Sequence, residues 1–476
     1  MDGLNTRYSY QSAPAFTSTV SSLPAYSARP PPPLELTRET SPRALTTHQY
    51  ELLNRNQRPW ATLKIKSLSG SPKNLPNVFE GTPVTGSVDL NFEREESVKC
   101  VKISFQGRIH LSANEKIPFV TISTDLWFID RGDPASPSPS TSNLKYTGKF
   151  KAGAQEEFSL PPSYYEKTMK CTIDYRIFAT IKRGFLNTKC EVGTTVVYTP
   201  IIIPEPFSCL RQLAYQQGSR LVGPEGDPEG WLSLEPIMLR GTAFNSRNTE
   251  AELVLSLAKP LSYTRGSIIP LHLTITSSDI QALDLLAHPR AIDIRLRRTV
   301  LLDENSYHDP IFSFVGIGSD NISRDEAHAA WWPPLAHSND HDEGDNAQRV
   351  NVGNGEKRVL DGEIRLDSNL FPSCRMGDFG IFYAIHIHPS SAVAFKLNVS
   401  VTSSPASVSS LSKSSSTQSH KSSSVLLSHP VEIVTAYSSG PRPKSYAPPA
   451  YGTDGLSSSS PRREVPTTFR QEQAFF

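Results

Sequence analysis

The feature that most restricts the fold of this chain is a strict alternation of side chains over residues 172–182. Five apolar side chains occupy every second position, namely Ile173, Tyr175, Ile177, Ala179 and Ile181. Mostly polar residues stand between them. Successive side chains of a strand point to opposite faces of a sheet, so this pattern predicts a half-buried antiparallel strand.

The same period of two recurs in both halves of the chain. It covers residues 84–92, 101–111, 253–257, 271–275, 292–296, 381–387 and 395–401. Further strands are expected at 194–198 and 431–434. Only residues 280–288 show helical spacing, with Leu283, Leu286 and Ala287 on one face. Two sets of short strands separated by a proline-rich connector predict an all-β protein with two tandem immunoglobulin-like β-sandwiches joined by a short hinge.

Composition shifts set the expected domain boundaries within the 476 residues. The C-terminal sandwich is expected to carry two polar or serine-rich inserts, and residues 133–142 form a further loop insertion. We predict a disordered proline-rich arm over 1–58, an N-terminal sandwich over 59–203, a hinge over 204–235, a C-terminal sandwich over 236–437 with inserts at 303–357 and 402–424, and a disordered tail over 438–476.

Charge and motif content narrow the classes of function. Lys plus Arg number 48 and Asp plus Glu 47, so the net charge of +1 gives no general attraction to nucleic acid. The five cysteines include no C-x-x-C pair, which disfavours a disulfide framework and a zinc module. No secretory or membrane-spanning segment is evident, and a cytoplasmic protein is expected. We find no catalytic motif and expect no enzyme, cofactor or metal site.

The chain contains, in this order, EGTPVTGSVDL, SVKCVKISFQGRI, DYRIFATIKRG, KPLSYTRGSIIPLHLTI and AIDIRLRRTVLL. Taken in this order, the five segments resemble those of the α-arrestins. EGTPVTGSVDL and SVKCVKISFQGRI resemble the opening strands of their N-terminal domains, and DYRIFATIKRG resembles the long middle strand. KPLSYTRGSIIPLHLTI, followed by AIDIRLRRTVLL, resembles the start of their C-terminal domain as fungal chains write it. The resemblance covers residues 60–302 and 358–437. It implies the arrestin fold.

The resemblance also implies a function. Proteins of this family are adaptors that bind membrane cargo and recruit a HECT-type ubiquitin ligase, whose WW domains bind P-P-x-Y motifs. Ubiquitination of the cargo then leads to endocytosis or sorting. It therefore implies a cytoplasmic protein that is recruited peripherally to the plasma membrane or to endosomes, with a ligase and a transporter or receptor as partners.

A P-P-x-Y motif is present in the C-terminal tail as Pro448-Pro449-Ala450-Tyr451. The proline pair favours the polyproline II conformation, so docking into an aromatic groove loses little entropy, while the tyrosine fills the next pocket. Pro448, Pro449 and Tyr451 are therefore the predicted WW-domain ligand. The alternative is a tail fragment without a partner.

Two related motifs are weaker candidates. Pro161-Pro162-Ser163-Tyr164 stands directly before the 172–182 strand, so we expect its prolines to shape a loop and a tyrosine to pack on the sandwich. Leu23-Pro24-Ala25-Tyr26 lacks the first proline. Leu23, Pro24 and Tyr26 are predicted as an auxiliary WW ligand that would raise avidity.

Three arginines, Arg295, Arg297 and Arg298, stand on one predicted strand, with the first two on one face and the third on the opposite face. They are interpreted either as a solvated outer face of a sandwich or as a patch for acidic cargo tails, phosphates or anionic lipids. The second interpretation suits an alternative function, a ubiquitin-independent β-sandwich scaffold or sorting protein on endosomal membranes.

Overall fold

A computed structural model describes the chain from Leu45, and the described residues from there onward belong to one compact unit. The predictions for the arm before residue 45, for the 133–142 loop and for the 402–424 serine tract lie outside the described residues. The structure describes residues 45–91, 98–112, 115–129, 149–152, 156–166, 171–183, 188–302, 322–334, 350–352, 355–377, 379–389, 392, 394–398 and 425–449.

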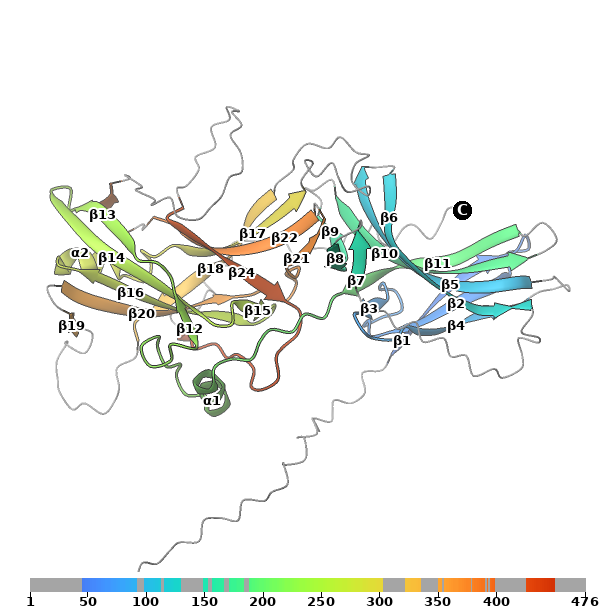
Figure 1. Cartoon of the computed structure of the whole chain (residues 1–476), viewed down its shortest axis with the longest axis horizontal. Helices are drawn as coiled ribbons and strands as arrows, with labels where there is room; N and C mark the ends of the chain where they lie inside the picture. The colour runs from blue at the N-terminus through green and yellow to red at the C-terminus, as the bar shows by residue number, and fades with distance from the viewer. Residues whose placement is uncertain are drawn as a thin grey trace, which may run out of the picture. The chain divides into compact units, whose positions relative to one another are not determined.

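The N-terminal block, residues 45–199, is built from two sheets that face each other (Figure 1). One sheet has the order β1-β2-β4, with β1 at Thr46–Leu53, β2 at Pro59–Ser67 and β4 at Thr85–Leu90. The other has the order β3-β11-β10-β5-β6, and β9 pairs with β10. Its strands are β3 (Asn77–Phe79), β5 (Val98–Ser112), β6 (Glu115–Phe128), β9 (Tyr164–Tyr165), β10 (Thr172–Arg183) and β11 (Thr188–Thr199). The prediction of an all-β chain with sandwich layers is confirmed.

Strand β10 is the centre of its sheet and coincides with the alternating segment. It is antiparallel to both β5 and β11, and its five apolar side chains are buried. The opposite face is more covered than predicted, because Asp174, Phe178 and Thr180 are also buried. Arg108 of β5 forms an ion pair with Asp174 at 2.6 Å, which offsets the cost of burying that carboxylate.

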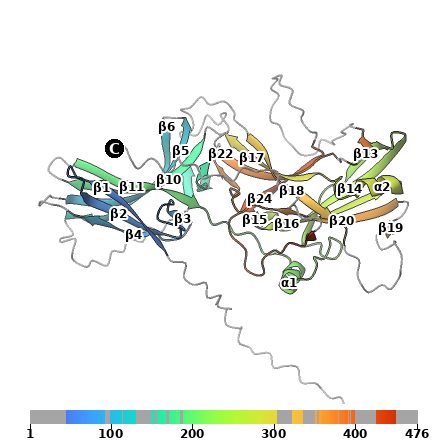
Figure 2. The ribbon, with the colours of Figure 1, turned by 180° about the vertical axis from the view of Figure 1, so that it is seen from behind.

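The C-terminal block, residues 231–434, is one long ladder that bends into two layers (Figure 2). Strand β18 pairs with β17 along its first part and with β20 along its end, and so joins the layers. The order is β15-β24-β22-β17-β18-β20-β16-β14-β13-β23, with β12, β19 and β21 as short side strands. The strands are β12 (Trp231–Ser233), β13 (Ile237–Ala243), β14 (Arg247–Ala258), β15 (Ser262–Thr264), β16 (Ile268–Ser277), β17 (Ile294–Leu302), β18 (Ile322–Trp332), β19 (Val350–Val352), β20 (Gly355–Arg365), β21 (Cys374–Met376), β22 (Phe379–Ile387), β23 (Phe395–Leu397) and β24 (Leu427–Val434).

The predicted helix exists as α2, Ile280–Leu286, which Asp279 caps through its side chain. It buries Ala282, Leu283 and Leu286 in the core. A separate small hairpin pairs β7 with β8. These strands are Lys149–Ala152 and Glu156–Ser159.

The predicted N-terminal arm and the predicted first insert each contain a strand. The arm predicted over 1–58 already contains β1, whose His48 is buried beside Ser67 and Ser69. The insert predicted over 303–357 contains β18, and its Trp331 and Trp332 are buried. Both strands carry many polar residues, and partners on neighbouring strands, rather than an apolar pattern, hold them in the sheets.

The connector between the blocks contains a helix that the prediction missed. Helix α1, Cys209–Gln217, begins after Ser208, whose side chain accepts the Arg211 amide, and ends at Gly218 in the left-handed conformation. Figures 1 and 2 show it outside the sheets, beside the C-terminal block. The capping residues Ser208 and Gly218 can be recognised in the sequence. The apolar face of the helix is too short and too weak to predict a helix by its spacing.

Candidate functional site

The P-P-x-Y motif begins at the point where the described C-terminal residues end. Pro448 is half-buried and Pro449 is exposed, and residues 441–448 form neither helix nor strand. Ala450 and Tyr451 lie outside the described residues. The structure therefore places the proline pair but not the tyrosine of the predicted WW ligand.

The segment leading to the motif lies on the protein surface in a defined position. A disordered tail was predicted from residue 438, but the structure gives residues 438–449 a defined position. We call residues 438–449 the C-terminal strap. Just before it, the Thr435 side chain accepts the Ile202 amide at 2.8 Å, and the Ala436 amide donates to the Ile202 carbonyl at 3.0 Å. These bonds join the end of β24 to the connector.

The strap contacts helix α1 along its course. The Tyr446 ring stacks on Tyr215 with ring centroids 6.3 Å apart and planes 18° apart. Lys444 lies beside Gly218, where its positive charge faces the negative end of the helix dipole. The helix that was missed in the connector thus forms one side of the surface on which the strap lies.

The other side of this surface is a buried carboxylate. Glu363 of β20 is 4% exposed, and it accepts the Ser445 hydroxyl at 2.5 Å and the Tyr446 amide at 3.1 Å. The nearest cation in an ion pair with it is Arg365, at 3.9 Å. A buried carboxylate is costly without hydrogen-bond donors, so the two strap donors stabilise it. Nothing in the sequence pattern pairs Glu363 with a residue 82 positions away.

The second proline motif packs in the core, and this prediction is confirmed. Tyr164 is 1% exposed and its hydroxyl donates to Glu166 at 2.7 Å. Burial, aided by the neighbouring Glu166 carboxylate, raises the pKa of Tyr164. The Pro161 carbonyl accepts the Tyr175 hydroxyl at 2.6 Å. These residues shape the end of the sandwich and are not presented for a WW domain.

The predicted auxiliary WW ligand, Leu23, Pro24 and Tyr26, lies outside the described residues. It stays a prediction.

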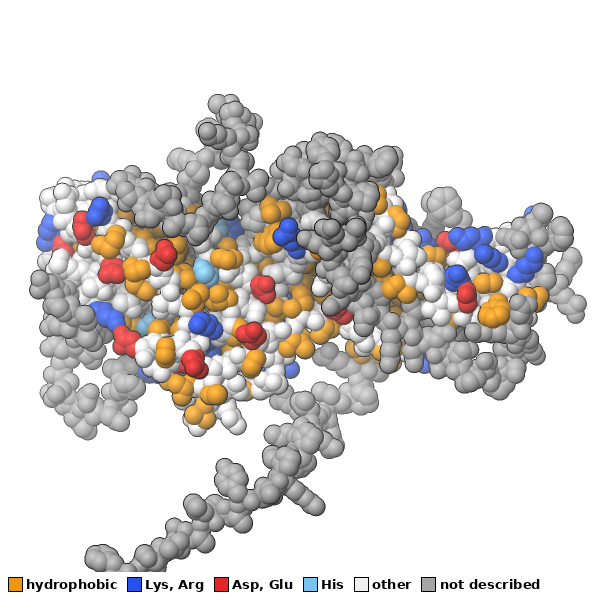
Figure 3. All heavy atoms as spheres, viewed as in Figure 1, with side chains coloured by type: hydrophobic (Ala, Val, Ile, Leu, Met, Phe, Trp, Pro, Cys, Tyr) orange, Lys and Arg blue, Asp and Glu red, His pale blue; other side chains and the backbone are white. Residues whose placement is uncertain are grey.

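The arginines of β17 are already paired with carboxylates. Arg295 donates to Asp293 through Nε at 2.7 Å and to Asp325 through Nη1 at 2.9 Å, and Arg297 donates to Asp325 through Nε at 2.6 Å. The bond that Arg295 donates to Asp293, with a further contribution from Asp325, raises the pKa of Arg295. Two cations and two anions balance in this group. Figure 3 shows acidic and basic side chains interspersed on the visible face of the C-terminal block.

Arg298 belongs to the core and not to a surface, because it is 1% exposed. It donates to Glu166 through Nη1 and Nη2 and to Glu326 through Nε at 2.6 Å. Burial alone would lower the pKa of Arg298, but the bonds to Glu166 and the charge of Glu326 raise it overall. The interpretation of a solvated outer face is therefore wrong for this residue. The alternation of the strand correctly separated it from Arg295 and Arg297.

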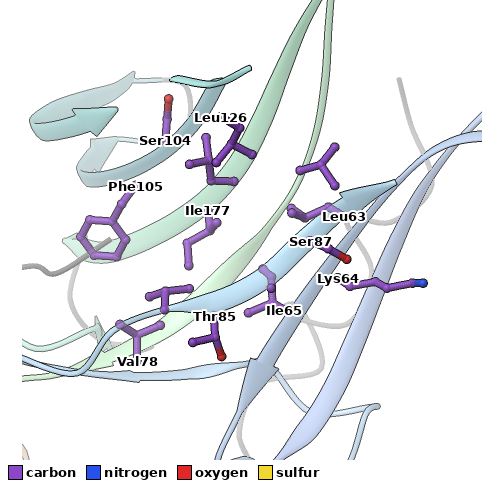
Figure 4. Close-up of a pocket in the computed structure, with 14 residues that line it drawn as sticks. Leu63, Lys64, Ile65, Val78, Thr85, Ser87, Ser104, Phe105, Leu126 and Ile177 are labelled. Atoms are coloured by element: carbon purple, nitrogen blue, oxygen red, sulfur yellow. The ribbon is translucent and has the colours of Figure 1, made fainter. Parts of the chain in front are cut away.

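The N-terminal block has a partly open cavity of about 60 Å³ between its two sheets. Ile65 of β2, Phe105 of β5 and Ile177 of β10 line it, and Figure 4 shows the Lys64 side chain extending away. Pockets for small ligands usually have volumes of roughly 300–1,000 Å³. The described lining contains neither histidine nor carboxylate. We interpret the cavity as a packing gap in the core.

A scan of the sequence against models of protein families finds no match, and a search of curated proteins likewise finds none. Among the described residues, neither helix has the length and apolar character needed to span a bilayer. The geometry of the described residues is thus the basis for assigning a function.

Proposed function

We propose that this chain is an arrestin-like trafficking adaptor. Its two sandwich blocks bind membrane cargo, and Pro448, Pro449 and Tyr451 recruit a WW-domain HECT-type ubiquitin ligase that modifies the cargo for endocytosis or sorting. The observation that carries the proposal is the position of the motif. The proline pair comes at the end of a strap that is attached to the C-terminal block, so a bound ligase would be held close to the sandwiches.

The chemistry of the motif supports this assignment. The exposed Pro449 offers a ring to an aromatic groove, and residues 441–448 before it form no helix or strand that would have to unfold before binding. The copy at Pro161–Tyr164 has the same letters but a buried tyrosine. Of the two exact P-P-x-Y sequences, the one in the tail is therefore the one proposed for ligase binding.

A pull-down of the full chain on immobilised WW domains of a HECT-type ligase tests the proposal. The double variant Tyr451→Ala, Tyr26→Ala should lose binding and keep the circular-dichroism spectrum of the wild type. Tyr8→Ala is the matched control, since it removes a tyrosine of the N-terminal arm outside any proline motif. Undiminished binding by the double variant would contradict the proposal.

The alternative, a ubiquitin-independent scaffold on endosomal membranes, would require free positive charge or another lipid contact. The pairing of Arg295 and Arg297 with Asp293 and Asp325 reduces its support. Cargo turnover that depends on Tyr451 would support the ligase adaptor. Cargo turnover that depends on Arg295 and Arg297 would support the scaffold.

A further inference from the structure

The attachment of the C-terminal strap depends on a small number of contacts around one serine. Ser445 Oγ donates to Glu363 Oε1, the next amide donates to Glu363 Oε2, and the Tyr446 ring lies on Tyr215. Ser445 itself is exposed, although its partner Glu363 is buried. A change at this hydroxyl therefore acts directly on the contact that holds the strap.

The sequence before Ser445 has the charge pattern of a kinase substrate. Arg442 stands three residues before the serine and Lys444 one residue before it, and both side chains are exposed. Basic residues at such positions are recognised by acidic residues in the substrate clefts of arginine-directed kinases. The guanidinium of Arg442 lies 4.3 Å from the centroid of the half-buried Tyr437, which directly precedes the strap.

We propose that Ser445 is a phosphorylation site for an arginine-directed protein kinase, and that its phosphate releases the strap from Glu363. The backbone of residues 441–448 is neither helix nor strand, so local opening presents it as an extended peptide without unfolding a sheet. In the reaction, Ser445 Oγ forms a bond to the γ-phosphorus of ATP and the bond to the β–γ bridging oxygen breaks. ADP leaves with the electron pair, and the hydroxyl proton passes to the kinase's catalytic carboxylate.

The product cannot keep the contact with Glu363. Phosphoserine carries a charge of about −1.5 to −2 at neutral pH, and its oxygens accept hydrogen bonds. The original donor is replaced by an anion that faces a buried carboxylate, so attraction becomes repulsion. Arg365 is 3.9 Å from Glu363 and half exposed, and its single positive charge does not balance both the carboxylate and the phosphate.

Release of the strap changes the presentation of the neighbouring proline pair, a consequence that rests on the proposed function. Pro448 is half-buried while the strap is bound, and a WW groove must surround the proline it recognises. Phosphorylation of Ser445 should therefore raise the affinity for a WW domain. The docked strap partly blocks access of a WW domain to the proline pair, and phosphorylation of Ser445 removes this block.

The test uses the full chain, ATP and the catalytic subunit of cAMP-dependent protein kinase, an arginine-directed enzyme. Mass spectrometry locates the phosphate, and hydrogen–deuterium exchange follows the amides of residues 436–449. We expect modification of Ser445 and exchange of the strap about tenfold faster or more. Ser445→Ala should show no change in strap exchange after the same treatment. Ser439→Ala, which removes a strap serine without a basic residue three positions earlier, should behave as the wild type does.

The outcomes separate this inference from the proposed function. A full chain that stays unmodified at Ser445 would overturn the site, and a modified chain with unchanged strap exchange would overturn its effect. Faster exchange together with tighter WW binding supports both proposals. Faster exchange without WW binding by either form supports the phosphorylation site and contradicts ligase recruitment.

Discussion

The guanidinium group of Arg298 holds the carboxylate of Glu166 in a two-point contact, with Nη1 to Oε2 at 2.9 Å and Nη2 to Oε1 at 2.8 Å. Arg298 lies on β17 of the C-terminal block, and Glu166 directly follows β9 of the N-terminal block. The pair thus connects two residues that are 132 positions apart. A bidentate contact of this kind has a fixed geometry as well as a favourable charge interaction.

Removal of this arginine should strongly destabilise the protein. Arg298→Met leaves the carboxylates of Glu166 and Glu326 without their common cation, and loss of one partner of a buried pair costs about 3–5 kcal/mol. Urea unfolding, followed by tryptophan fluorescence, measures the change. Arg297→Met is the control, because its partly exposed pair should contribute less than about 1 kcal/mol. Equal losses in the two variants would contradict the buried role of Arg298.

Acid should weaken the β17–β18 contact at Asp325. Burial tends to raise the pKa of Asp325, but the bonds from Arg297 and Arg295 outweigh burial and lower it to about 2 from 3.8. A carboxyl group whose pKa is lower in the folded state than in the unfolded state stabilises the fold at pH values above its unfolded-state pKa. This stabilisation is lost as the pH falls through the folded-state pKa. The window is thus about pH 4 to pH 2.

The free energy of unfolding of the wild type should exceed that of Asp325→Asn by about 1 kcal/mol at pH 5, since solvent screens part of the pair. The difference should shrink towards zero at pH 2. Urea titrations at both pH values check this. A difference that is independent of pH would show that the charge of Asp325 is not what stabilises the contact.

Gly107 should tolerate no side chain. A Cβ added at this position of β5 would lie 2.6 Å from the Phe119 ring and 2.8 Å from the Tyr175 ring, both of which are buried. Gly107→Ala should therefore destabilise the N-terminal block by about 1–3 kcal/mol. Gly70→Ala, where a Cβ has no heavy atom within 4 Å, is the matched control and should be neutral or slightly stabilising. The melting temperatures of the two variants, measured by thermal unfolding, test this difference in stability.

The paired arginines of β17 should give little attraction to anionic membranes. Arg295 and Arg297 are balanced by Asp293 and Asp325, so the wild type should not sediment with phosphatidylserine vesicles through this face. The double variant Asp293→Asn, Asp325→Asn uncovers two cations and should bind roughly tenfold more tightly or better. Strong wild-type binding that disappears in Arg295→Gln, Arg297→Gln would instead favour the membrane scaffold.

Local patterns in the sequence were sufficient for much of the fold. The alternation around Tyr175 predicted β10, and the spacing of Leu283 and Leu286 predicted α2. The position of Pro161 before a strand predicted a packed tyrosine, which the structure shows to be Tyr164. Each of these depends on neighbours within a few residues, which a period or a turn rule can read.

The remainder depended on partners that are distant in the chain. Strand β1 and the polar strand β18 are held by ladders to other strands, and a pattern of their own residues does not reveal this. The alternation of β17 places Arg298 on the face opposite Arg295 and Arg297, but only the approach of Glu166 and Glu326 shows that this face lies in the core.

The sequence by itself determined the all-β class, the two groups of strands and the existence of a P-P-x-Y motif, because periodicity and motifs are local properties. Only the tertiary structure decided that the tail is bound as far as Pro449 and that Ser445 meets Glu363. That contact joins residues 82 positions apart, and a buried carboxylate can select its donor only after the sheets have formed around it.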